Sequence, residues 1–173
     1  MKTQVEQLQR QLKAAYRTSR WHSLQRALEG LKPEEAAWTP AHYKGFPWAK
    51  GSILEILFHV AGDTLHQLDY AFGSGTLTWD ALKERFERAG GDLKAAQTLL
   101  DEAYAELERR LSALTDSDLS RSYRAPDGEK TLQELFEMIL EHFLYHAGQI
   151  VYVRNLQSGQ RSLRADRLQN PAA

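Results

Sequence analysis

Two histidines stand four residues apart in the stretch EHFLYHAGQI, residues 141–150, where the apolar pattern predicts a long amphipathic helix. At 100° per residue, His146 lies about 40° around such a helix from His142, and Gln149 lies about 20° to the other side. The same sector otherwise carries leucine, isoleucine and valine. The spacing therefore places both imidazoles on one face, about 6 Å apart along the axis, where they can bind one metal ion.

A third histidine, His59, lies at the edge of the apolar face of an earlier predicted helix. Glu55 and Asp63 lie one turn before and after it on the same side. Carboxylates so placed can accept a hydrogen bond from the second ring N–H of a metal-bound histidine. Three neutral imidazoles from two helices leave positions open on a tetrahedral or octahedral ion, which is typical of catalytic sites.

The predicted metal ligands are His59, His142 and His146. Candidates for proton handling or substrate contact are Glu55, Asp63, Tyr145 and Gln149. Each of these four has an alternative interpretation as a supporting, surface or helix-packing residue. The catalytic residues therefore stay unassigned at this level.

The other histidines do not fit the same site. His66 lies about 10.5 Å along the axis from His59, whereas metal–nitrogen bonds are about 2.1 Å long, so one ion does not readily bind both. His22 and His42 have no partner at ligand spacing, and we expect solvated or structural roles for them. No glutamate stands three residues before a histidine, which excludes the Glu-x-x-His pairs of ferritin-like di-iron sites. The His-Glu-x-x-His pattern of zinc proteases is also absent.

Composition narrows the classes of partner. The chain has 173 residues, 42% of them hydrophobic and 26% charged, with a formal net charge of −1, so it lacks the basic field that nucleic-acid binding needs. It contains no cysteine, which excludes disulfides and thiolate metal sites. No stretch approaches the roughly 18 apolar residues of a membrane span, and the N-terminus lacks the apolar core of a signal peptide. We therefore expect a cytoplasmic protein without nucleic-acid or membrane partners, acting on a small molecule if it is an enzyme.

Four long segments have helical periodicity, and Gly- or Pro-marked stretches separate them. The predicted helices cover residues 3–29, 52–72, 92–114 and 131–155, with a short helix over 79–88 and a long connection over 30–51. Capping-box pairs mark three of the starts, at Thr3 with Glu6, Ser52 with Glu55 and Thr131 with Glu134. No run alternates with period two. These features predict an all-α, antiparallel four-helix bundle.

One domain is expected over residues 1–157, because a chain of this length can bury a single core without stabilisation by disulfides or structural metal ions. Residues 158–173 are expected to form a C-terminal tail. This part of the chain is locally basic, and we interpret its arginines as solvated.

The segments SILEILFHVAGD and TLQELFEMILEHFLYHAGQIVYVRN resemble the DinB/YfiT-like superfamily of damage-inducible bundle proteins. The specific part is the three histidines and the HAGQI stretch, while Trp48 and Thr131 also stand where this family tends to have such residues. The resemblance follows the order of the helices along most of the chain.

This resemblance implies an up-down-down-up four-helix bundle, often dimeric, with a nickel or zinc ion bound at the positions of His59, His142 and His146. Related branches include S-transferases that use low-molecular-weight thiols such as bacillithiol, a mycothiol-dependent isomerase, and proteins described as metal-dependent hydrolases. It therefore implies a homodimer with a divalent metal cofactor and, in the transferase case, a thiol co-substrate.

Two other hypotheses remain open. In the first, the chain is a non-catalytic, dimeric stress-response bundle in which the metal only joins two helices. In the second, there is no metal, and the histidines are hydrogen-bonded to Glu55, Asp63 and Gln149.

Overall fold

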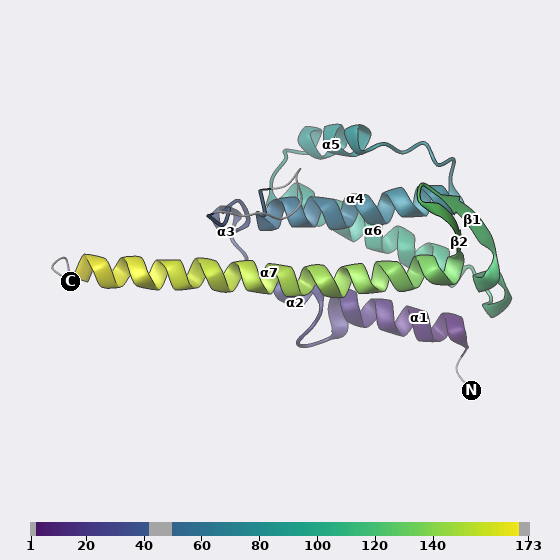
Figure 1. Cartoon of the computed structure of the whole chain (residues 1–173), viewed down its shortest axis with the longest axis horizontal. Coiled ribbons are helices and arrows are strands. Elements are labelled where there is room, and N and C mark those ends of the chain that lie inside the picture. Colours follow the sequence, from purple (N-terminus) through teal and green to yellow (C-terminus); the bar gives the residue numbers. More distant parts are fainter. Residues whose placement is uncertain (1–2, 42–49, 170–173) are drawn as a thin grey trace.

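The computed structural model describes residues 3–41 and 50–169, with side chains to residue 159, and it is predominantly helical (Figure 1). The helices are α1 (Gln4–Lys13), α2 (Leu24–Leu28), α3 (Pro33–Ala36), α4 (Ile53–Phe72), α5 (Trp79–Arg88), α6 (Leu93–Ser112) and α7 (Leu132–Gln169). A π-helical turn, η1 (Ala14–Thr18), follows α1, and a 3-10 turn, η2 (Asp116–Ser120), follows α6. A hairpin of β1 (Ser122–Ala125) and β2 (Gly128–Thr131) precedes α7.

Side-chain caps explain where the long helices begin. The three predicted capping boxes are present, at Thr3 with Glu6, Ser52 with Glu55 and Thr131 with Glu134. The carboxylate of Asp92 accepts a hydrogen bond from the backbone N–H of Ala95 at the start of α6. Each cap satisfies backbone donors that have no partner within the helix, which contributes about 1 kcal/mol per cap.

The long helices pack on one another around a single apolar core. α4 contacts both α6 and α7, and α1 also contacts these two helices, while α5 lies on the outer side of α4 (Figure 1). The rings of Phe136 and Phe143 on α7 are fully buried in this core. Burying a side chain of this size stabilises the fold by roughly 2 to 3 kcal/mol. A predominantly helical bundle therefore positions α4 beside α7.

The first predicted helix is interrupted. α1 ends at Lys13, and residues 19–23 separate η1 from α2, so the prediction of one helix over residues 3–29 was wrong in its middle. The hydroxyl of Ser23 donates to the carbonyl of Ser19 and accepts from the backbone N–H of Arg26. Serine side chains that bond the backbone locally compete with continuous helix and favour a new N-terminus.

The hairpin was not predicted, and the expectation that the chain has no strands was wrong. Its strands are four residues long, and Ala125 pairs with Gly128 across a turn formed by Pro126 and Asp127. The ammonium group of Lys130 lies 2.6 Å from the Asp127 carboxylate. Strands this short show too few alternations to produce a period-two pattern.

α7 continues as far as Gln169, beyond the end expected near residue 155. Its C-terminal part extends past α4 and α6 (Figure 1). The residues expected to form a tail therefore begin inside this helix. The division of the chain at residue 157 stays a prediction.

The long connection between α2 and α4 contains α3, and Trp38 packs against the core beside it. His42, Tyr43, Phe46 and Trp48 lie outside the described residues. Among the helices in the described ranges, none combines the length and the apolar character needed to cross a bilayer.

Candidate metal centre

Two neighbouring helices supply the three predicted ligands. His59 lies near the middle of α4, and His142 and His146 lie one turn apart on α7. α4 and α7 pack against each other, which brings residues 83 positions apart in the sequence together. His146 is buried, with 2% of its surface exposed, while the other two histidines are half-buried.

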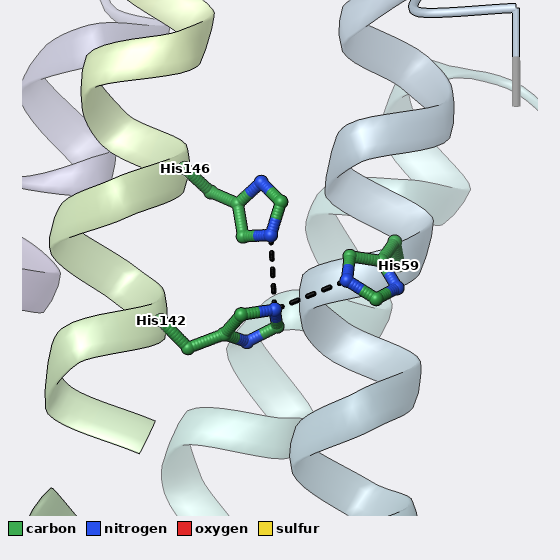
Figure 2. Close-up of side chains that lie close together, drawn as sticks. All are labelled: His59, His142 and His146. Carbon is green, nitrogen blue, oxygen red and sulfur yellow. Dashed lines mark hydrogen bonds between the residues drawn. The ribbon is translucent and has the colours of Figure 1, made fainter. Parts of the chain in front are cut away.

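The Nε2 atoms of the three imidazoles converge (Figure 2). His142 Nε2 lies 3.0 Å from His59 Nε2 and 2.9 Å from His146 Nε2, and all three ligand atoms lie within 4.8 Å of one another. A tetrahedral ion with metal–nitrogen bonds of about 2.1 Å would separate its ligand atoms by about 3.4 Å. The two short separations are therefore about half an ångström below this value, and side-chain shifts of about an ångström would fit the cluster to one ion. Within the described residues, this is the group of side chains suited to binding a metal.

The Nδ1 atoms of His142 and His146, on the outer side of the cluster, face polar side chains. Nδ1 of His146 lies 2.8 Å from Gln149 Oε1, and Nδ1 of His142 lies 3.5 Å from Asp63 Oδ2. An amide oxygen can only accept, so the Gln149 contact requires the proton of His146 on Nδ1. The Nε2 lone pair of His146 then points into the cluster, which is the tautomer that a metal ligand requires.

The cluster favours uncharged imidazoles. Burial, and next the adjacent imidazoles, lowers the pKa of His59 and of His142 to about 4. Burial also lowers the pKa of His146, an effect that the Gln149 hydrogen bond and the Asp63 carboxylate oppose. All three rings are therefore neutral near pH 7, and neutral imidazole is the form that binds a metal ion.

A tryptophan forms one wall of the site. The Trp79 ring stacks on His59 with ring centroids 5.9 Å apart and an interplanar angle of 13°. It lies directly over Gly62, where an added Cβ would stand only 2.6 Å from Trp79 Cζ3. Gly62 therefore provides the space in which the indole covers the α4 face beside His59.

A groove between α4 and α5 is lined in part by this tryptophan. Its volume is about 570 Å3, and its lining is formed by Leu54, Glu55, Phe58, Trp79, Lys83, Phe86 and Glu87. The rings of Phe58 and Phe86 lie 5.0 Å apart, and the ring of Phe58 lies 6.1 Å from that of Trp79. A largely apolar groove of this volume is within the range of small-molecule sites.

Of the other residues considered in the sequence, Tyr145 contacts the cluster, whereas the carboxylate of Glu55 bonds to the start of α4 and His66 lies outside the cluster. The ring of Tyr145 contacts that of His146 edge-on at 4.9 Å, and its side chain is 61% exposed. The carboxylate of Glu55 accepts hydrogen bonds from the backbone N–H groups of Lys50 and Ser52 at the start of α4. His66 is outside the cluster, and its ring contacts those of Tyr70 and Trp79.

Several neighbours of the site were missed by sequence reasoning. The pairing of Gly62 with Trp79 depends on how α5 folds back onto α4, and no local pattern indicates it. Tyr123 on β1 has a buried hydroxyl without a hydrogen-bond partner among the described residues. Burial raises its pKa, and nearby carboxylates, including that of Asp63, add to this effect. Since the hairpin itself was not predicted, Tyr123 could not be placed near the bundle core.

A known protein family matches the chain. A sequence model described as the DinB superfamily matches residues 16–150, which is most of the chain and includes all three histidines. Among curated proteins, none matches the chain.

Proposed function

Because the chain belongs to the DinB superfamily, we propose that it binds one divalent ion, zinc or nickel, through His59, His142 and His146. We further propose that it uses this ion in thiol S-transfer or hydrolysis of a small molecule. The observation that supports the proposal most directly is the convergence of three neutral imidazoles from α4 and α7. The bundle is proposed to follow the up-down-down-up order of this superfamily.

The ion would supply a nucleophile near neutral pH, either by deprotonating a bound thiol or by lowering the pKa of a bound water. The chain's own residues prepare the site for it. Gln149 fixes the tautomer of His146, and Asp63 lies where it can orient His142. Three protein ligands leave further coordination positions for the substrate or co-substrate.

The apolar groove between α4 and α5 is proposed to hold the apolar part of the substrate. It shares Trp79 with the metal centre, since this side chain lines the groove and stacks on His59. An aromatic wall gives area for stacking, while Lys83 and Glu87 stand among the groove residues as polar contacts. Tyr145 stays a candidate for substrate contact because its ring contacts that of His146.

A second proposal is a dimeric, non-catalytic bundle in which the ion joins α4 to α7. The observation that favours it is that all three ligands come from these two helices. A homodimer is proposed in both cases, from the resemblance to the superfamily.

Substitution of a ligand separates the two functions. His59→Ala should abolish chelator-sensitive conjugation of bacillithiol or glutathione to a fluorogenic electrophile while the variant stays folded, if the ion is catalytic. If the ion is structural, the wild type shows no such conjugation and His59→Ala mainly lowers the melting temperature. His66→Ala is the matched control, because His66 is another half-buried histidine of α4 outside the cluster.

A further inference from the structure

One face of α7 exposes a row of large apolar side chains. The exposed fractions are 43% for Leu144, 61% for Tyr145, 43% for Val151, 64% for Tyr152 and 37% for Leu156. Leu144 and Val151 are seven residues apart, as are Tyr145 and Tyr152, and Leu156 follows Tyr152 by four. At 100° per residue, all five positions therefore fall within about 140° of the helix circumference, on one side of α7. We refer to the exposed residues of α7 from Leu144 to Gly159 as the α7 face.

This face carries no charge, although every residue from 144 to 159 is described. Its other exposed members are Gly148, Asn155, Ser158 and Gly159. The single charged residue of the segment, Arg154, turns away and donates to the backbone carbonyls of Ala27 and Glu29. A solvent-facing helix surface normally has charged and polar residues, so an uncharged apolar row of this length indicates a contact surface.

Gly148 supports this interpretation. A glycine inside a helix costs roughly 1 kcal/mol relative to alanine. An added Cβ at Gly148 would meet nothing within 4 Å, so no contact inside the chain requires the small residue. The absence of a side chain would instead leave a gap into which a large side chain of another molecule can pack.

The charges at the two ends of α7 indicate how a second copy would be oriented. Before the α7 face, the exposed residues Glu134, Glu137 and Glu141 make the helix acidic. After it, residues 160–169 contain three arginines and one aspartate, so that end of the sequence is basic. Antiparallel α7 helices place each acidic end beside a basic end, whereas parallel helices place like charges together.

We propose that the α7 face binds a second copy of this chain, with the two α7 helices antiparallel and Tyr152 of each copy packed over Gly148 of the other. This inference rests on the homodimer part of the proposed function and names its surface. An uncharged apolar face is self-complementary, as a two-fold interface requires. Its five large side chains expose on the order of 500 Å2 per copy, a large part of the roughly 800 Å2 per partner in a stable interface.

The α7 face is adjacent to the metal centre, because Tyr145 belongs to it and contacts His146. A second copy would therefore cover one edge of the site. The match to the DinB superfamily ends at residue 150, whereas Val151, Tyr152 and Leu156 follow it.

The first test is the mass in solution, measured by light scattering after size-exclusion chromatography at micromolar concentration. The wild type should have twice the 19.8 kDa of one chain, and Tyr152→Glu should have the mass of one chain with an unchanged circular dichroism spectrum. Because the substitution acts twice in a two-fold interface, we expect the dissociation constant to rise by more than about 100-fold. The matched control is Trp21→Glu, which changes an aromatic residue that is 72% exposed and belongs to the segment between η1 and α2 rather than to the α7 face, and this variant should stay dimeric.

Cysteine cross-linking tests the orientation, since the natural chain has no cysteine. A mixture of the Gly148→Cys and Tyr152→Cys proteins should form a disulfide-linked pair under mild oxidation, more efficiently than either protein alone. Linkage mainly within the Gly148→Cys protein would overturn the antiparallel arrangement. A dimeric Tyr152→Glu protein would overturn the surface but leave the homodimer intact, while a monomeric wild type would overturn both. Metal content is measured separately, so a failure of the proposed metal site can be distinguished from a failure of the proposed dimer interface.

Discussion

Replacing Asp63 by asparagine tests whether the carboxylate beside His142 contributes to metal binding. Asp63 Oδ2 lies 3.5 Å from His142 Nδ1, and its side chain is 18% exposed. The imidazole and one metal–nitrogen bond together span about 4 Å, so the carboxylate charge would lie within roughly 8 Å of the ion. At an effective dielectric constant of about 20, a single negative charge attracts a divalent ion by about 4 kcal/mol at that distance.

The net effect should be smaller, because water partly screens the carboxylate and asparagine keeps a polar contact to the imidazole. Loss of a group that orients a metal-bound histidine typically weakens binding 10- to 100-fold, or about 1.4 to 2.7 kcal/mol. We expect Asp63→Asn to raise the dissociation constant for zinc by this factor. Competition with a chromophoric chelator measures it, and Asp80→Asn, at an exposed position on α5, should bind as the wild type does. An Asp63→Asn affinity within twofold of the wild type would refute this electrostatic reasoning.

Three further predictions concern the bundle itself. Ser52→Ala removes the N-cap of α4 and should lower the free energy of unfolding by about 1 kcal/mol in urea titrations. Hydrogen bonds from two arginines, first Arg109, lower the pKa of Glu106 to about 2, so its stabilisation is present above pH 4.5 and is lost as the pH falls toward 2. The stability difference between wild type and Glu106→Gln should therefore be about 1 kcal/mol or less at pH 7, given the partial exposure of this group, and should vanish near pH 2. Gly62→Ala should displace the Trp79 ring and change the near-ultraviolet circular dichroism. Alanine has the higher helix propensity but the displaced ring loses its stacking, so the two effects offset each other and the free energy of unfolding should change by less than about 1 kcal/mol.

Local signals in the sequence located most helix starts. Ser52 with Glu55 marked the first turn of α4, and the short helix predicted over residues 79–88 is present as α5 (Trp79–Arg88). Such signals work because capping depends on residues within one turn of each other. The break before α2 was missed because the apolar pattern resumes at Leu24, so residues 3–29 read as one helix. The side-chain hydrogen bonds of Ser23 that begin a new helix there leave no mark in that pattern.

The same difference between local and long-range signals separates the site residues that were predicted from those that were missed. Its histidines were found because helical spacing places His142 beside His146, and the packing of α4 against α7 then brought His59 to them. The partners that depend on long-range packing were missed. Trp79 reaches His59 only after α5 folds back over Gly62, and its stacking depends on no periodicity within α4.

A zinc titration of protein purified without a nickel column and freed of metal by a chelator tests the central claim most directly. We expect the wild type and His66→Ala to bind one ion per chain, and His59→Ala and His142→Ala to lose at least about 100-fold in affinity. A wild type without a site for zinc or nickel, or a His59→Ala variant that binds as tightly as the wild type, would contradict the three-histidine centre.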